Sequence, residues 1–149
     1  MSPETPPPAD HGAEEHSWKD DRFGAEAAAA VDAALATLAS PDDALRVLDL
    51  TKRAGAGFAA FLLLSDTDAA ADDLDEKFST AYVDAWEDFS HFRRDVLDGL
   101  GWLDAVNDVM KTQGIPEDHL IWNTAAIDIQ IFDTYDLVRL DGWWHVFNK

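Results

Sequence analysis

The sequence has 149 residues, of which 30 are Asp or Glu and 11 are Lys or Arg, so its formal net charge is −19. This charge excludes direct binding of nucleic acid, which needs a basic surface. The absence of cysteine excludes disulfides, thiol catalysis and cysteine-based zinc sites. Hydrophobic residues make up 47%, with six Trp and eight Phe, which is enough for a folded core and unlike a disordered acidic chain.

The acidic residues are unevenly chosen and unevenly placed. Asp outnumbers Glu by 23 to 7, although Glu is the better helix former. The short Asp side chain holds its carboxylate close to the backbone; a genomic bias toward Ala and Asp codons is the alternative explanation. Residues 1–64 carry a net charge of −6 and residues 65–149 one of −13, so a function that uses the charge is predicted for the second part.

The first predicted element is a disordered tail over residues 1–21, which has Pro3 and Pro6–Pro8 but no hydrophobic periodicity. It lacks the basic start and apolar stretch of a signal peptide. The longest apolar stretch, Ala56–Leu64, is too short to span a membrane. We therefore expect a cytoplasmic protein.

Three helices are predicted next. The alanine-rich helix Ala25–Ala39 is followed by Ser40 and Pro41, which are typical of an N-cap and a first helical turn. The helix that they begin ends at Gly55. A short apolar helix, Phe58–Leu64, follows and is expected to be buried.

A long helix is then predicted from Ser65 or Asp66 to about Trp86. Apolar residues such as Phe78 and Tyr82 recur along it at helical spacing, with acidic residues on the opposite face. This spacing indicates that the aromatic side chains belong to the core.

Shorter helices are expected after it. One begins near Asp88 and ends at Gly99 or Gly101, and the next continues to Gly114. Pro116 is predicted to open the last helix.

The end of the sequence changes to the period of a β-strand. Tyr135–Leu140 and Trp143–Phe147 alternate, and Asp141-Gly142 between them is a strong signal for a two-residue type I′ turn. This loop sets the pairs Leu140–Trp143, Val138–His145 and Asp136–Phe147. The elements together predict an α+β fold, mostly α-helical, with a C-terminal β-hairpin.

Large apolar groups occur on both faces of this hairpin. One face is expected to pack on the helices, and the other needs a third strand, another domain or a second subunit. Trp143 and Trp144 point to opposite faces, so one of them is a candidate for a dimer or domain interface. This pattern predicts a homodimer.

Motifs for catalysis are missing from the sequence. It has no phosphate-binding loop, dinucleotide-binding glycines, nucleophile elbow or zinc-protease helix. His91, His119 and His145 have no spacing of metal ligands, and Asp66-x-Asp68 lacks the remaining ligands of a calcium loop. We therefore expect no catalytic residue, no metal and no cofactor.

Three phrases carry a resemblance to a known family. Phe78-Ser-Thr-Ala-Tyr82-Val-Asp84-Ala-Trp86 looks like F-x-x-A-Y-x-G-x-[WY], and Ile121-Trp122-Asn123-Thr124-Ala125-Ala126-Ile127-Asp128 resembles Y-[IF]-D-[WY]-x-x-[IY]-A-R-D-L. Asp141-Gly142-Trp143-Trp144-His145-Val146-Phe147 is similar to D-G-x-[VW]-H-V-F. In this order, between about Asp43 and Phe147, they resemble the ArdA family of antirestriction proteins, whose N-terminal domain is missing or replaced here.

The resemblance implies an elongated, often dimeric DNA mimic. Such proteins occupy the basic DNA-binding groove of type I restriction–modification enzymes, and other DNA-processing enzymes are possible targets. The resemblance divides the sequence into a tail (1–21), a helical N-terminal region (22–64) and an ArdA-like acidic helical region that ends in the hairpin (65–149). It implies no direct nucleic-acid binding and no membrane.

The residues predicted to mimic phosphates are the acidic side chains on faces opposite the apolar stripes. They are Asp72, Asp73, Asp75, Glu76, Asp84, Glu87, Asp88, Asp95, Asp98, Asp104, Asp108, Glu117, Asp118, Asp128, Asp133 and Asp136. One alternative is an acidic protein-interaction module aimed at another anti-phage defence or DNA-processing protein. The other is an enzyme whose site is too dispersed to recognise in one sequence.

Overall fold

The structure is a computed structural model and describes residues 21–149. The expected tail lies outside the described residues apart from Asp21. The elements are α2 (Ala25–Ala36), α3 (Pro41–Ala54), α4 (Ala56–Leu62), α5 (Leu74–Ala81), β1 (Tyr82–Trp86), α6 (Phe89–Gly99), α7 (Trp102–Gln113), the 3₁₀ helix η1 (Glu117–His119), α8 (Thr124–Thr134), β2 (Tyr135–Leu140) and β3 (Trp143–Asn148). The expected mostly helical α+β fold with a C-terminal hairpin is confirmed.

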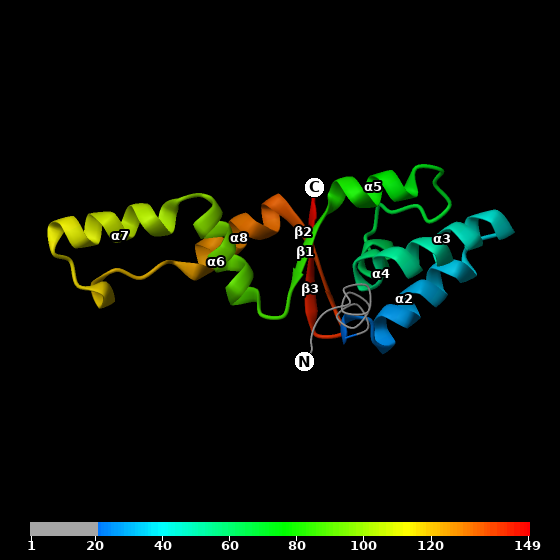
Figure 1. Cartoon of the computed structure of the whole chain (residues 1–149), viewed down its shortest axis with the longest axis horizontal. Coiled ribbons are helices and arrows are strands. Elements are labelled where there is room, and N and C mark those ends of the chain that lie inside the picture. Colours follow the sequence, from blue (N-terminus) through cyan, green and yellow to red (C-terminus); the bar gives the residue numbers. More distant parts are fainter. Residues whose placement is uncertain (1–20) are drawn as a thin grey trace, which may run out of the picture.

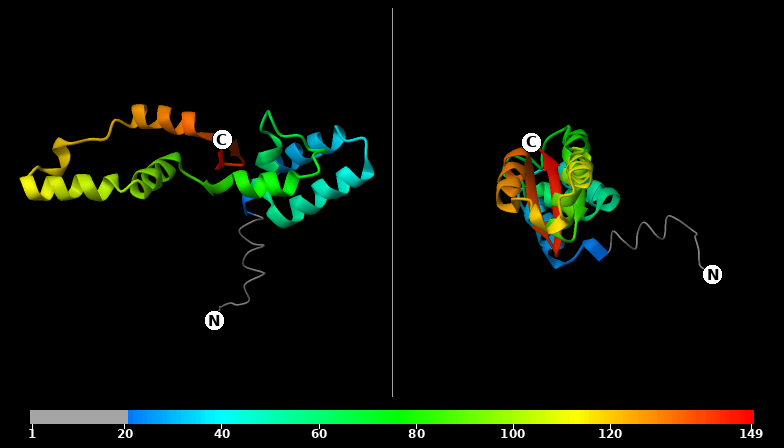
Figure 2. Two further views of the ribbon diagram at one scale, coloured as in Figure 1. Left: turned by 90° about the horizontal axis from the view of Figure 1, so that it is seen from above. Right: turned by 90° about the vertical axis from the view of Figure 1, so that its left-hand side faces the viewer.

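An antiparallel sheet of three strands, in the order β1-β3-β2, lies in the middle of the molecule. Figure 1 shows α2–α5 on one side of it and α6–α8 on the other. The views in Figure 2 show that the described chain is long in one direction and narrow across it. We call α2–α5 the N-terminal lobe and residues 100–134 the arm.

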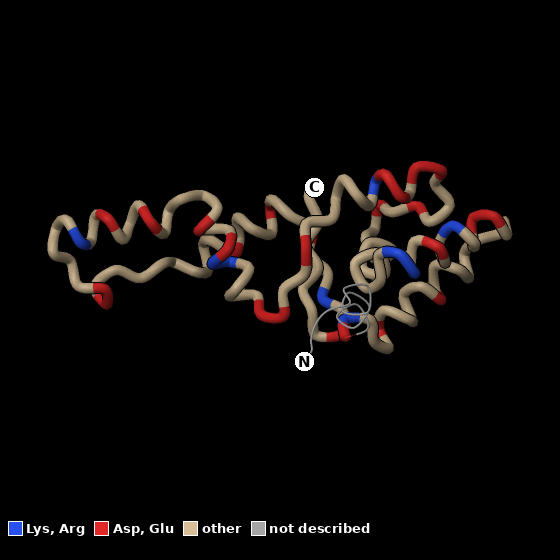
Figure 3. The backbone as a smooth tube through the Cα atoms, in the orientation of Figure 1, with Lys and Arg blue, Asp and Glu red and all other residues tan. Residues whose placement is uncertain are grey.

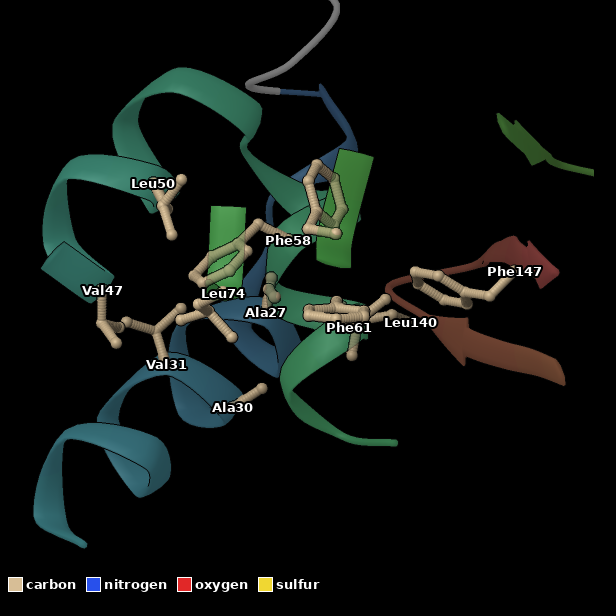
Figure 4. Packing of buried hydrophobic residues seen from close by; sticks show 13 residues of the cluster. Ala27, Ala30, Val31, Val47, Leu50, Phe58, Phe61, Leu74, Leu140 and Phe147 are labelled. Carbon is tan, nitrogen blue, oxygen red and sulfur yellow. The ribbon is translucent and has the colours of Figure 1, made fainter. Parts of the chain in front are cut away.

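The larger core lies between the N-terminal lobe and one face of the sheet. Short helix α4 is buried along most of its length, as expected for this apolar segment, and contributes Phe58 and Phe61. The ring centroids of Phe61 and Phe147 are 5.9 Å apart, and those of Phe61 and Phe78 are 5.5 Å apart. Figure 4 shows Phe147 of β3 reaching this cluster from the sheet. The core therefore joins the N-terminal lobe to the last strand.

A smaller core covers the other face of the sheet. It is built around Phe92, Ile131 and Val146. The Trp86 ring packs on Phe92 with centroids 4.5 Å apart. Since neighbouring side chains of a strand point to opposite faces, Val146 and Phe147 place β3 in both cores.

The hairpin has the predicted register. Leu140 pairs with Trp143, Val138 with His145 and Asp136 with Phe147. Asp141 and Gly142 have φ values of 50° and 84°, the two positive values that a type I′ turn needs.

The Asp141 side chain also caps helix α2, more than a hundred residues away in sequence. Its carboxylate accepts hydrogen bonds from the backbone N–H groups of Gly24 (2.8 Å), Glu26 (2.9 Å) and Ala27 (2.9 Å). The Glu26 carboxylate in turn accepts the backbone N–H of Asp141 at 2.6 Å. This reciprocal arrangement resembles a capping box, but its two halves come from different parts of the chain and fix the turn on the helix.

The Asp141 cap accounts for the glycine at position 24 and lowers the pKa of Asp141. A Cβ atom at Gly24 would lie 2.7 Å from the Asp141 carboxylate, so a side chain there requires the cap to move. Burial acts to raise the pKa of Asp141, but the hydrogen bonds from Ala27, Glu26 and Gly24 outweigh it and hold the pKa below its ordinary value.

The predicted helix from Ser65 or Asp66 to Trp86 is wrong in its extent. Only Leu74–Ala81 is helical, and Tyr82–Trp86 is a strand paired with β3. Aromatic and β-branched residues favour a strand, and here their partner lies some sixty residues later in the sequence. The helical spacing of Phe78 and Tyr82 was therefore misleading.

The prediction that Pro116 opens the last helix is also wrong. Pro116 precedes only the 3₁₀ turn η1, and α8 begins at Thr124. Asn123 is its N-cap, with its side chain accepting a hydrogen bond from the N–H of Ala126 at 3.1 Å.

The two apolar faces of the hairpin are covered within the chain, because β1 supplies a third strand and the two cores fill the faces. Both candidate interface residues are half-buried. The Arg22 guanidinium lies 4.3 Å from the centroid of the Trp143 ring. Trp144 packs edge-on against Phe89 with centroids 5.3 Å apart. The hairpin therefore does not need a second subunit.

A buried polar pair lies within the sheet. His145 is fully buried, and its Nδ1 atom is 3.1 Å from the Tyr82 hydroxyl. Its Nε2 atom has no hydrogen-bond partner among the described residues. Burial, and then the charge of Arg22, lowers the pKa of His145 to about 4, so the imidazole is neutral at pH 7.

We predict that replacing Asp141 with Ala lowers the free energy of unfolding by about 1–2 kcal/mol, the usual effect of losing a helix cap. Asp141→Asn should lose less, because Asn tolerates a positive φ and keeps one acceptor oxygen. Urea denaturation measures both. Asp133→Ala is the control, since Asp133 is an exposed acid near the end of α8, and it should leave stability unchanged or slightly higher.

We also predict that His145 makes the fold sensitive to acid. Its pKa is lower in the folded chain than in the unfolded chain, so the unfolded state binds the proton first. The stability that depends on the neutral ring is complete above pH 6.5 and is lost progressively toward pH 4, by about 3 kcal/mol at most.

Comparing the chain with its His145→Gln variant separates this effect from the titration of the carboxylates. The stability advantage of the natural chain should shrink as the pH falls from 7 to 4. An advantage that stays constant over this interval would contradict the prediction.

Candidate functional site

The sixteen predicted acidic residues are distributed along the whole length of the molecule (Figure 3). They occur before and in α5, on and after β1, on α6, α7 and α8, in η1, and on β2. Fourteen of them are exposed; Asp128 and Asp136 are half-buried. The structure therefore distributes these residues along the molecule and does not gather them in one pocket.

Several of these acids are paired with basic residues of the same chain. The ion pairs with exposed acids are Arg46–Asp72 (3.9 Å), Lys77–Asp73 (3.7 Å), Arg53–Asp75 (3.5 Å) and Arg22–Asp84 (3.8 Å). Pairs this exposed contribute little to stability, but they compensate part of the negative charge near α5 and β1.

Two further acids are hydrogen-bonded. Asp88 caps α6 by accepting the N–H and the hydroxyl of Ser90, at 2.9 and 2.7 Å. These bonds, the one from the hydroxyl first, lower the pKa of Asp88. Asp95 accepts the indole N–H of Trp86 at 2.8 Å. Both carboxylates thus have local structural partners as well as exposure to solvent.

Asp128 is bound more firmly than the other acids. The Arg93 guanidinium on α6 donates to both of its carboxylate oxygens, at 2.7 and 2.8 Å. The hydrogen bond to Asp128 raises the pKa of Arg93 above its ordinary value. This two-point pair joins α6 to α8 and compensates the charge of Asp128.

Nine of the sixteen carboxylates form no ion pair or side-chain hydrogen bond with a described residue. They are Glu76, Glu87, Asp98, Asp104, Asp108, Glu117, Asp118, Asp133 and Asp136. We call them the unpaired acids. Five of them lie in the arm and two more, Asp98 and Asp136, lie next to it, whereas Lys111 is the one Lys or Arg between positions 100 and 134.

The arm also exposes apolar side chains, which sequence reasoning missed. Of the large hydrophobic residues that are exposed in the described chain, the following lie in the arm: Leu100, Trp102, Val109, Leu120, Ile121, Trp122, Ile129 and Phe132. Ile121 is 92% exposed. The sequence did contain a signal for this exposed apolar surface. Ile121-Trp122 lies between Pro116 and the N-cap residue Asn123, and therefore outside any helix.

A hollow of about 650 Å³ opens between α7 and the segment that precedes α8. Its apolar walls come from α7 on one side and from Leu120, Ile121 and Trp122 on the other. Arg94 and Glu117 are among its polar lining residues. A second hollow, of about 470 Å³, lies between α8 and the segment where α6 ends and α7 begins.

Within residues 21–149, no group of three or more His, Cys, Asp or Glu side chains is placed to hold a metal ion. No helix in that part of the chain is long and apolar enough to cross a membrane. The titratable pair with the largest displacements of pKa, Tyr82 and His145, lies inside the sheet and lines neither hollow of the arm.

Comparison with known proteins finds no family model, no curated protein and no solved structure that matches this chain.

We predict that Asp128→Asn loosens the arm, because it leaves the half-buried Arg93 without its charged partner. The free energy of unfolding should fall by about 1–2 kcal/mol, and amide hydrogen exchange in α8 should become faster. Asp133→Asn is the matched control on the same helix. Equal exchange in the two variants would show that the pair does not hold α8.

Proposed function

We propose that the protein is an acidic DNA mimic that occupies the DNA-binding groove of a DNA-processing enzyme, first of all a type I restriction–modification enzyme. The observation that carries this proposal is the set of nine unpaired acids. They are among the acidic residues that Figure 3 shows along a long, narrow body. The three phrases that resemble the ArdA family support the choice of target.

The physical basis is competition for the lysines and arginines that bind phosphates. Duplex DNA carries one negative charge per ~1.7 Å, so a net charge of −19 matches about 32 Å of duplex. Exposed carboxylates that lack partners among residues 21–149 can pair with a basic groove and release its counterions. Complementary potentials also speed the encounter.

The proposal requires no chemical step. The protein binds, covers the groove and keeps DNA out, with no catalytic residue, metal or cofactor. The paired acids serve a different purpose, since Asp88 and Asp128 hold α6 and α8 in place. The unpaired acids are then the part of the predicted set that contacts the enzyme.

A homodimer remains part of the proposal on the strength of the family resemblance alone. Its support from the sequence was the hairpin, whose two faces are covered by α2–α5 and α6–α8 of the same chain. The dimer interface, in this proposal, does not include the faces of the sheet.

The second candidate function is an acidic interaction module for another anti-phage defence or DNA-processing protein. The observation in its favour is the apolar surface of the arm, which has no counterpart in DNA. Binding that responds little to salt distinguishes this candidate from a mimic, because contacts with a basic groove weaken steeply as salt rises.

We predict that the protein protects unmodified phage in a host that carries a type I restriction system, measured as plating efficiency. Replacing the nine unpaired acids with Asn or Gln should abolish the protection. It should weaken binding to the purified enzyme about 100-fold at 0.1 M salt and flatten the salt dependence. The variant should fold, and its free energy of unfolding should be unchanged or higher, because repulsion between the carboxylates is relieved.

A pair of double variants provides a matched control. Asp104→Asn with Asp108→Asn removes two unpaired acids from the predicted surface. Asp32→Asn with Asp66→Asn removes two exposed acids outside it. The first should weaken binding more than the second. Full protection by the nine-residue variant would refute the mimic.

A further inference from the structure

The apolar side chains of the arm are gathered and not scattered. Most of the exposed large hydrophobic residues of the described chain lie between residues 100 and 132, although this arm is a minor part of that chain. Single exposed hydrophobic residues are normal, but a concentration of them marks an interaction site. The rest of the surface offers a smaller group, with Leu45 and Leu48 on α3 and Leu63 after α4.

The hollow of about 650 Å³ gives this surface a shape. Leu103, Val106 and Met110 lie on one face of α7, at positions i, i+3 and i+7, and form one wall. Ile121 and Trp122 contribute to the other wall. We call this hollow the arm groove. Its volume is enough for several side chains of a partner segment.

The second wall is poorly tied to the rest of the molecule. Leu120 has extended backbone angles (φ −125°, ψ 123°). No backbone hydrogen bond joins Leu120, Ile121 or Trp122 to another described residue. Their backbone N–H and C=O groups are therefore available for hydrogen bonds with a partner segment. Such bonds would offset the free-energy cost of burying these groups under that segment.

The charge around the groove defines the chemistry of that partner. Asp104, Asp108, Glu117 and Asp118 are unpaired acids on α7 and η1, the elements next to the groove. They outnumber the nearby basic residues, which are Arg94 in the groove lining and Lys111 on α7. Apolar walls beside fixed negative charge fit a segment with apolar anchors flanked by Lys or Arg, whose long stems also cover apolar surface.

A second copy of this chain is a poor match for the groove. It would bring the same acidic elements against each other. Among its basic residues, Arg46, Arg53, Lys77 and Arg93 are already paired with acids of their own chain, and Arg94 lies in the lining of the groove itself. A basic partner from another protein satisfies both the charge and the apolar walls.

We propose that the arm groove anchors a basic segment of the target protein through two or three of that segment's apolar side chains. The inference rests on the proposed function for the identity of the target, the enzyme whose DNA-binding groove the acidic surface occupies. Binding then has two parts: a salt-sensitive part from the unpaired acids and a part from the arm groove that persists at high salt.

The first experiment uses peptides, so that it does not depend on the target. The full chain is titrated into a fluorescent 18-residue peptide with Leu at helical i, i+3, i+4 and i+7 positions and Lys between them. A scrambled peptide has the same composition, and an acidic version has Glu in place of Lys. The measurement is anisotropy, at 0.1 M salt for the comparison of the basic and acidic peptides and at 0.5 M salt for the comparison of the variants.

The variants are Ile121→Ser in the groove and Leu45→Ser on α3. Both residues are exposed, at 92% and 63%, so neither change removes a core side chain. The natural chain and Leu45→Ser should bind the basic amphipathic peptide equally. Ile121→Ser and the scrambled peptide should each bind about tenfold more weakly, the effect of losing one well-placed apolar contact.

Three results would overturn the proposal. The first is equal peptide binding by Ile121→Ser and the natural chain. The second is equal binding of the acidic peptide. The third is a dimer in sedimentation velocity that Ile121→Ser converts to the 16.4 kDa monomer, because a second copy would then occupy the groove.

The second experiment separates this inference from the proposed function. Binding of the purified type I enzyme is measured at low and high salt for the natural chain, for Ile121→Ser and for the variant that lacks the unpaired acids. Ile121→Ser should reduce the binding that remains at high salt. If the enzyme binds and Ile121→Ser changes nothing, the groove proposal fails and the mimic stands. If the enzyme is not bound but peptide binding depends on Ile121, the groove stands and the choice of target fails.

Discussion

The structure depends on strand β3 being buried on both faces and paired on both edges. Val146 and Phe147, neighbours in the sequence, belong to different cores, and β1 and β2 satisfy the hydrogen bonds on either side. A strand in this position cannot shift by one residue, because every side chain would change cores. The Asp141 cap adds a second constraint by fixing the turn beside β3 on the start of α2. The N-terminal lobe and the arm are therefore held on opposite sides of one rigid sheet.

The arrangement of two small cores around one sheet explains how the chain accommodates its large negative charge. An acidic chain with a single round core would concentrate its repulsion, whereas two small cores on either side of a sheet spread the carboxylates along a line. Ion pairs near α5 and between α6 and α8 compensate charge where elements meet. Apart from Asp128, the acids of the arm lack such compensation among the described residues, and there apolar and acidic side chains lie side by side. We regard this combination as the feature that distinguishes the molecule from a simple line of phosphates.

The accuracy of the sequence predictions followed the range of the interactions involved. The register of the hairpin was predicted correctly because Asp141-Gly142 encodes its turn locally, and so was the start of α3 because Ser40-Pro41 encodes it. Strand β1 was missed because its partner is distant and Phe78, Tyr82 and Trp86 happen to repeat at four residues. Exposure of the acids followed from the amphipathic pattern, but pairing did not: nothing in the sequence shows that Arg93 holds Asp128 while Asp133 forms no ion pair with a described residue. The arm groove was hidden because it depends on how α7 and Ile121 are arranged in space.

The position of β3 in the sequence also bears on how the chain folds during synthesis. Helices α2–α5 and α6–α8 precede β3 in the sequence. The core beside α2–α5 nevertheless needs Phe147 of β3, and the core beside α6 and α8 needs Val146 of β3. The contacts that join Gly24 and Ala27 to Asp141 span more than a hundred residues. Neither half can therefore reach its final packing until the ribosome has passed residue 147. Until then the aromatic side chains of both groups lack their final packing, and the like charge of the nascent chains opposes their association.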